Sequence, residues 1–335
     1  MNSQLSSLEL SHFPVMLSEV IQISDPKKGG QFVDCTFGGG NYTKALLNFP
    51  NTKVVGIDRD AAVISIAQNL KQQFKTRFQF YQAKFSKIEK ILKENVDTII
   101  FDLGLSSIQL NDFKRGFSFR SKEKLDMKMG LSDKSAEDVI NNLSESQLTM
   151  IIKILGEEKE AKIIAKNIVK ARLTKKITRV NELAEIIQKS KKQYSKKINP
   201  STKTFQALRI FVNKEITELI HGIISASKLL KPGGKILIIS FHSIEDKIIK
   251  YFFKNFSKNK SKPSRYFPEE NLKNFELFES YSNKVIKPTK IEIEKNLPSR
   301  SAKLRYAIRS DNKFNFPTNL IDKFSKYLKI EALHV

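Results

Sequence analysis

The sequence has little cysteine and no long apolar run. Cys35 is the single cysteine in 335 residues, so no disulfide can form within one chain, and a reducing compartment is expected. The apolar runs are far shorter than a membrane span, and the first residues lack the basic and apolar segments of a signal peptide. We therefore expect a cytoplasmic protein without a signal peptide or a membrane segment.

Internal repeats, low-complexity domains and metal-ligand spacings are also missing from the sequence. We therefore expect a globular enzyme or binding protein without a bound metal. A chain of this length can bury about three quarters of its unfolded surface and needs no disulfide or metal to stabilise it. The sequence does not give the oligomeric state, and a homodimer stays open.

Acidic residues are scarce relative to basic ones. The chain has 35 Asp plus Glu against 59 Lys plus Arg, a formal charge of +24. This excess indicates a polyanionic partner such as nucleic acid, although a compositional drift toward lysine explains it equally well. Two basic clusters suit phosphates and splayed bases, or are ordinary solvated surface: Lys191, Lys192, Lys196, Lys197 and Lys203 around Tyr194 and Phe205, and then Arg300, Lys303, Arg305 and Arg309.

The first hundred residues alternate between strand and helix patterns. Strands are predicted at Gln31–Thr36, Lys53–Asp58, Arg77–Gln82 and Val96–Leu103, with a helix at Ala61–Phe74. The last strand is a near-continuous apolar run, which is typical of a buried parallel strand. The pattern predicts an α/β fold with a doubly wound, Rossmann-like sheet.

The alternation stops between Asn111 and Pro200, where only helical patterns occur. We predict helices at Ala136–Leu143, Glu145–Leu155, Glu158–Arg172 and Val180–Lys189. The sequence thus predicts the first part of a doubly wound α/β domain at 1–110, a helical insert at 111–203, the second part of the α/β domain at 204–310, and a C-terminal helical extension at 311–335.

Alternation resumes after the insert. A helix is predicted at Thr204–Leu230, a strand at Lys235–Phe241, a helix at Ile244–Phe256 and a last strand at Lys303–Arg309. We expect Ser243 to cap the helix that follows it, with Asp246 as the partner of a near capping box.

A glycine-rich loop joins the first strand to a helix. Gly38, Gly39 and Gly40 follow Asp34, and Asp58 ends the next strand about 20 residues later. Glycines let the backbone approach a ligand closely, and an acid at that strand tip suits ribose hydroxyls. The loop is nearer to one that holds S-adenosylmethionine than to the spaced glycines of dinucleotide enzymes. The alternative is an ordinary tight turn.

Two further strand tips carry polar side chains. Asp102 ends the fourth strand, where it would orient an acceptor, hold the amino-acid end of the cofactor, or cap the next turn. His242 follows a later strand and is a base, an RNA contact or a structural histidine. Cys35 is interpreted as a small buried residue, which argues against methylation at pyrimidine carbon 5 and favours transfer to nitrogen or oxygen.

Ten segments together resemble one family, in the right order along nearly the whole chain. They are HFPVMLSEV, DCTFGGGNYT, GIDRD, FDLGLSSIQL, RGFSF, LDMKM, GEE, STKTFQALRIFVNKE, SFHSIEDK and RSAKLR. They are similar to the bacterial 16S ribosomal RNA cytosine-N4 methyltransferases of the RsmH or MraW type. This resemblance implies a class I S-adenosylmethionine methyltransferase fold with a helical substrate-recognition insert.

The resemblance also implies the reaction and the site. It implies methylation of the exocyclic N4 of a decoding-centre, P-site cytosine in the 16S RNA of the small ribosomal subunit. It implies cofactor contacts from Gly39, Gly40, Asn41, Asp58, Phe85, Asp102 and Gln109. Asp102 is in addition our candidate catalytic residue, as the group that takes up the proton of the amine.

The sequence departs from the family pattern at two positions. Asn41 replaces a usual histidine but can still donate and accept hydrogen bonds, and Lys128 replaces a usual arginine and loses its planar fork. Phe117 and Phe119 either stack the target base or belong to the core.

Two alternative functions stay open. One is a methyltransferase of this fold with another nucleic acid or protein target, and the other is a non-catalytic RNA-binding assembly factor.

Overall fold

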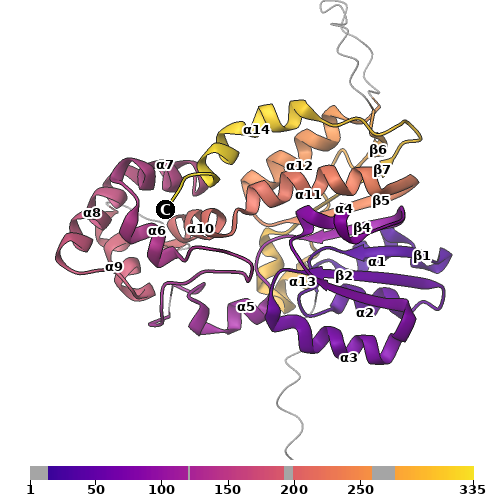
Figure 1. Cartoon of the computed structure of the whole chain (residues 1–335), viewed down its shortest axis with the longest axis horizontal. Helices are drawn as coiled ribbons and strands as arrows, with labels where there is room; N and C mark the ends of the chain where they lie inside the picture. Colours follow the sequence, from indigo (N-terminus) through magenta and orange to yellow (C-terminus); the bar gives the residue numbers. More distant parts are fainter. Residues whose placement is uncertain (1–13, 120, 192–198, 259–275) are drawn as a thin grey trace, which may run out of the picture.

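The fold is built on a seven-stranded sheet (Figure 1). The computed structural model describes residues 14–119, 121–191, 199–258 and 276–335. The strand order is β3-β2-β1-β4-β5-β7-β6, with β7 antiparallel to both of its neighbours and β1 to β5 parallel. The strands are β1 (Gly30–Asp34), β2 (Thr52–Asp58), β3 (Phe78–Gln82), β4 (Val96–Asp102), β5 (Leu230–Ser240), β6 (Phe278–Tyr281) and β7 (Lys303–Arg309).

Helices cover both faces of the sheet, as the apolar strands require. One face packs against α1 (Leu17–Ser24), α2 (Asn41–Leu47) and α3 (Ile64–Phe74). The other packs against α4 (Ile88–Ile91), α11 (Glu215–Leu229) and α12 (Ser243–Asn255). The sheet order reverses beside β1, between β1 and β4, which is the position where α/β proteins bind ligands. The predicted class I α/β fold is confirmed.

A lobe of helices projects from one side of the sheet (Figure 1). It follows the short helix α5 (Ser107–Asn111) and contains α6 (Ala136–Asn142), α7 (Glu145–Leu155), α8 (Ala161–Thr174), α9 (Val180–Ser190) and α10 (Thr202–Asn213). Ser135 and Ser144 cap α6 and α7 through capping boxes with Asp138 and Gln147. The helices bury aliphatic faces against one another, so their patterning alone explains the lobe.

The predicted long helix at Thr204–Leu230 is wrong, because the chain breaks at Lys214. Lys214 adopts a left-handed conformation with a φ of 52° and separates α10 from α11. The buried Asn213 side chain accepts from the N–H of Met129 and donates to the carbonyl of Met127. Because α10 packs on α6 and α7, we propose Asn213 as the end of the helical insert, in place of the predicted residue 203.

The C-terminal helix α14 (Thr318–Glu331) crosses from the sheet to the helical lobe (Figure 1). Its last residue, Glu331, is buried and accepts hydrogen bonds from the N–H groups of Ile216 and Thr217. These are orphan donors in the first turn of α11, so Glu331 acts as a cap supplied from a distant helix. The predicted helical extension therefore holds α11 in place.

Other sequence predictions hold to within a few residues. Strands β1 to β4 and β7 lie where expected, whereas no pattern in the sequence indicated α1, the short strand β6 or α13 (Lys290–Lys295). None of the helices in the described ranges is both long and apolar enough to cross a membrane.

Candidate active site

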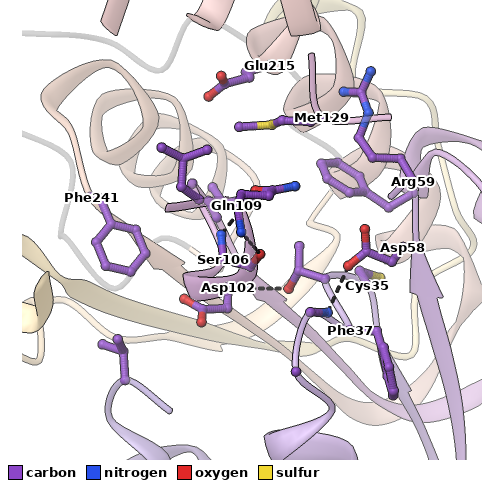
Figure 2. A pocket seen from close by; sticks show the side chains of 18 of the residues that line it. Cys35, Phe37, Asp58, Arg59, Asp102, Ser106, Gln109, Met129, Glu215 and Phe241 are labelled. Atoms are coloured by element: carbon purple, nitrogen blue, oxygen red, sulfur yellow. Dashed lines mark hydrogen bonds between the residues drawn. The ribbon is translucent and has the colours of Figure 1, made fainter. Parts of the chain in front are cut away.

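A cavity opens at the carboxyl ends of β1, β2, β4 and β5 (Figure 2). Its walls include the loop after β1, the tips of β2 and β4, the start of α11 and the residue that follows β5. The N-terminal residues Pro14 and Val15 and the distant Pro298 complete it. The cavity therefore combines segments from nearly the whole length of the described chain.

The glycine loop is held to the tip of β2. The N–H of Gly38 donates to Oδ2 of Asp58 at 2.8 Å, and the N–H of Asp60 donates to Oδ1 at 2.9 Å. Burial raises the pKa of the Asp58 carboxyl, and these two donors oppose that rise. Asp58 thus presents a carboxyl group to the cavity from a fixed position, as Figure 2 shows.

The three glycines have different roles. Gly38 and Gly39 line the cavity, and a Cβ at Gly39 would meet only the side chain of Asn41 at 3.4 Å. Gly40, with a φ of 72°, lies behind the loop, where a Cβ would stand 2.8 Å from the ring of Phe37. The prediction of Gly40 as a cofactor contact is therefore not supported, because Gly40 does not line the cavity and its conformation and packing require glycine.

Gln109 lies in the cavity wall but has its own partners. Its Oε1 accepts from the N–H of Ser106, which closes the capping box of α5, and its Nε2 donates to Asp60 at 2.8 Å. Arg115 forms an ion pair with the same Asp60 carboxylate. Burial would raise the pKa of Asp60, but the bonds from Gln109, Ala62 and Arg115 lower it. Gln109 thus ties the turn after β4 to the tip of β2.

Phe85 forms another part of the wall, after β3. Its ring packs edge-on against Phe101, with the centroids 5.3 Å apart. A Cβ on Gly222 of α11 would lie 2.5 Å from the Phe85 ring, so only glycine leaves room for it. Gly222 therefore fixes how far the ring of Phe85 extends into the cavity.

Asp102 stands at the tip of β4 with an incompletely paired carboxyl group. Its Oδ1 is buried and has no hydrogen-bond partner among the described residues, while its N–H donates to Thr36. Burial and the nearby carboxyl of Asp34 raise the pKa of Asp102 to about 8, although the neighbouring Tyr42 hydroxyl opposes this. Such a carboxyl can give up or take a proton near neutral pH.

His242 has a structural role, and it replaces Ser243 as the cap of α12. Its Nδ1 accepts from the N–H of Glu245, whose carboxylate accepts from the N–H groups of Phe241 and His242. The predicted cap at Ser243 is thus wrong by one residue. The Asp246 side chain instead pairs with Lys303 and Arg305.

One group of side chains in the described ranges has the composition of a metal site. Glu215, His242 and Glu245 bring ligand atoms within 4.8 Å of one another. Arg209, however, donates to both carboxylate oxygens of Glu215, at 2.8 and 2.9 Å. The guanidinium already supplies the positive charge that a cation would bring, so we assign no metal here.

The two basic clusters that were predicted to contact RNA do not form a continuous exposed surface among the described residues. Arg305 and Arg309 are buried, and Arg309 donates to backbone carbonyls, so this part of the second basic cluster is not a free surface. In the first cluster Lys191 is paired with Glu158 and Phe205 is buried, whereas Lys203 is exposed. Lys192, Tyr194, Lys196 and Lys197 lie outside the described residues.

Phe117 and Phe119 belong to the core. Phe117 is buried, with Arg115 over its ring, and Phe119 packs edge-on against Phe205.

The interpretation of Cys35 as a small buried residue is confirmed, since its thiol is buried and burial raises the pKa of that thiol well above its usual range.

The structure thus brings most of the predicted site residues to one cavity. Gly39, Asn41, Asp58, Phe85, Asp102 and Gln109 all line it. Sequence reasoning did not assign Glu215, Glu218, Phe241 or Pro298 to the site, although Phe241 and Glu215 lie in segments that carried the family resemblance. Their distance from the glycine loop along the chain left no local signal.

The walls fit an adenosine-type cofactor. The open loop at Gly39, the fixed carboxyl of Asp58 and the ring of Phe85 offer a backbone cradle, a hydroxyl acceptor and an apolar surface. Asp102 adds hydrogen-bonding capacity that no described residue uses.

Comparisons with known proteins find the following similarities. The chain is 42% identical over 304 residues to the ribosomal RNA small subunit methyltransferase H of Ehrlichia canis. That alignment covers 89% of this chain and 99% of the Ehrlichia protein. The chain is 42% identical over 299 residues to the protein of the same name from Rickettsia akari, which covers 89% and 98%. An rRNA methylase structure from Streptococcus thermophilus aligns with a TM-score of 0.39 and 9% identity, over 87% of this chain and 96% of that one.

The sequence pattern of the MraW methylase family matches residues 9–310. This match and the relatives show that the protein is an enzyme, a methyltransferase that uses S-adenosylmethionine. The chain belongs to the MraW methylase family.

Proposed function

We propose that this enzyme methylates the exocyclic N4 of a P-site cytosine in 16S RNA, within small ribosomal subunits in the cytoplasm. The names of the relatives support the small-subunit RNA as substrate. The observation that carries the chemistry is the Asp102 carboxyl, which stands at the cavity edge with unused hydrogen-bonding capacity. The buried thiol of Cys35 offers no nucleophile for attack on pyrimidine carbon 6.

We propose that the cofactor is held by the loop at Gly39 and Asn41, by Asp58 and by Phe85. Asp58 would accept hydrogen bonds from ribose hydroxyls, and Phe85 would pack against an adenine ring. When bound, S-adenosylmethionine supplies a methyl group whose bond to sulfur breaks as the bond to nitrogen forms, with the electron pair left on sulfur. Gln109 acts through Asp60, by positioning the turn after β4.

Asp102 has two tasks in this proposal. Its carboxylate accepts a hydrogen bond from the cytosine amine, which draws electron density toward nitrogen, and it takes up the proton that the amine loses. The raised pKa of Asp102 makes the carboxylate a better base than an exposed aspartate. Orientation of the amine supplies much of the remaining rate enhancement.

The experiment is methyl transfer from labelled S-adenosylmethionine to small subunits from a strain that lacks this methylation. The RNA is digested to nucleosides, which are identified by mass spectrometry. N4-methylcytidine is the expected product, and transfer should fall steeply as salt is raised, because the positive protein binds a polyanion. Methyl groups on another base, or transfer only to tRNA, DNA or protein, would contradict the proposal.

A further inference from the structure

The base that accepts the methyl group needs a surface that supports its ring, and the cavity offers one on the β5 side. Several aromatic side chains line the cavity, but most already pack against other rings or bonds. Phe37 stacks on Phe78, Phe85 packs on Phe101, and the buried Tyr42 donates its hydroxyl to the carbonyl of Val15. Phe241 also lines the cavity, is only partly buried, and has no ring-to-ring contact within the described residues.

Phe241 and Asp102 share one face of the sheet. Asp102 pairs with Ile239 in the parallel register of β4 and β5, and Phe241 lies two residues beyond Ile239. As register partners in parallel strands, Ile239 and Asp102 point to the same face, and Phe241 packs against the apolar cluster that contains Ile239. Figure 2 shows the Asp102 carboxyl on the Phe241 side of the cavity, with Asp58 on the other side.

The corner that carries Phe241 is fixed before any ligand binds. The N–H of Phe241 donates to Glu245 at 2.9 Å, and the buried Glu245 is itself held by the capping box with His242. Burial would raise the pKa of Glu245, but its contacts with His242 and the N–H of Phe241 lower it, so Glu245 stays an acceptor. This arrangement fixes the backbone of Phe241, which reduces the ordering that binding requires.

A glycine leaves the Phe241 ring accessible next to Asp102. Gly104, two residues after Asp102, has a φ of 98°, and a Cβ there would lie 3.3 Å from Cδ2 of Phe241. Pro14, Val15 and Pro298 add further apolar lining to the same cavity. A flat apolar ring near the Asp102 carboxyl suits a heteroaromatic ring that carries an exocyclic amine.

We propose that Phe241 is a substrate-binding residue that supports the ring of the acceptor base, so that its exocyclic amine meets the carboxyl of Asp102. This inference rests on the proposed function and names the surface that the base occupies. Any base has a π-face, so Phe241 supplies orientation, while Asp102 selects a ring with a hydrogen-bond donor at that edge.

The test compares Phe241→Leu with Phe241→Tyr in the full-length enzyme, with unmethylated small subunits as substrate. The leucine variant should lose about ten- to hundredfold in kcat/KM, which is the usual range for loss of base stacking. The tyrosine variant should keep at least a third of wild-type kcat/KM. Both should bind S-adenosylhomocysteine with a Kd within about twofold of wild type by calorimetry. Phe316→Leu, at an exposed ring far along the chain, is the matched control and should be unchanged.

The outcomes separate this inference from the proposed function. If the wild-type enzyme makes no N4-methylcytidine, the proposed function itself fails. If the wild type is active but the leucine variant keeps full kcat/KM, or the tyrosine variant is as poor as the leucine variant, Phe241 does not support the base. An equal loss of S-adenosylhomocysteine affinity and activity in the leucine variant would likewise overturn the inference, because it would mean a structural role.

Discussion

The sheet part and the helical insert bury different kinds of side chain. The sheet part buries several ionisable groups: Asp34, Asp60, Glu218, Glu245, Arg305 and Arg309. Within the described residues 121–191 of the insert, Glu158 is the single buried charged residue, and its partner is Lys191. The rest of that core is aliphatic. Buried charges cost stability, and their concentration in the sheet part coincides with the walls of the cavity, to which the insert contributes Met129.

Asp102→Asn, in the sheet part, should have the largest effect on turnover. The amide keeps the size of the side chain but cannot take up a proton, so turnover should fall by about 10²- to 10⁴-fold. Cofactor affinity should change much less, because Asp58 and the glycine loop are untouched. Single-turnover methylation and calorimetry with S-adenosylhomocysteine measure the two effects. Full turnover in this variant would remove Asp102 from the mechanism.

The same variant should be more stable than the wild type at neutral pH. The pKa of Asp102 is about 8 in the folded protein and 3.8 when unperturbed, so the folded state disfavours its ionised form. The wild-type carboxyl therefore costs stability increasingly as the pH rises from about 4 to 8. Thermal unfolding should show Asp102→Asn stabilised by roughly 1–3 kcal/mol near pH 8, with the difference lost near pH 4. Destabilisation at pH 8 would indicate a structural role.

Leu148→Ala in α7, in the insert, should lower stability and leave cofactor affinity unchanged. Leu148 is fully buried in the insert, and its truncation should lower the free energy of unfolding by about 2–5 kcal/mol. Affinity for S-adenosylhomocysteine at a temperature where the variant is folded should be unchanged. Met150→Ala on the exposed side of the same helix serves as the control and should cost little. A parallel loss of cofactor affinity would show that insert and cofactor site are energetically coupled.

The pH dependence of the reaction should report the Asp102 carboxyl. With a pKa of about 8 in the free enzyme, roughly a tenth of the molecules carry the carboxylate at pH 7. kcat/KM should therefore rise about tenfold between pH 7 and pH 9 and then level off. Asp102→Asn should abolish that rise in the residual activity. A flat wild-type profile would contradict the assignment of Asp102 as the base.

Gly222→Ala should have the smallest effect among these variants, a several-fold loss of cofactor affinity. The new methyl group would lie 2.5 Å from the Phe85 ring and push that ring toward the cavity. The Kd for S-adenosylhomocysteine should rise while turnover at saturating cofactor changes little. His221→Ala, at the exposed neighbouring position of α11, is the control. An unchanged Kd would mean that Phe85 lies outside the cofactor site.

Local patterns allowed the sequence to predict the part of the cavity at the tips of β1, β2 and β4. Asp58 and Asp102 end apolar strands, and Gly39 lies in a strand-to-helix loop, so each could be located from its neighbours. Phe241 also ends a predicted apolar strand, but an aromatic ring there carried no signal of a polar site. Glu215 could not be assigned in this way, because the break at Lys214 brings it to the cavity. The burial of Arg305 depends on Asp246 of another element, which no local pattern reveals.

The insertion of the helical lobe between β4 and β5 also affects how the enzyme is made on the ribosome. Asp102 and Ile239 are register partners in the middle of the sheet, yet the whole insert separates them in the sequence. During synthesis the edge of β4 therefore stays unpaired until the insert and α11 have left the exit tunnel. Glu331, the cap of α11, emerges later still. The β5 side of the cavity is therefore completed only after the insert and α11 have been synthesised.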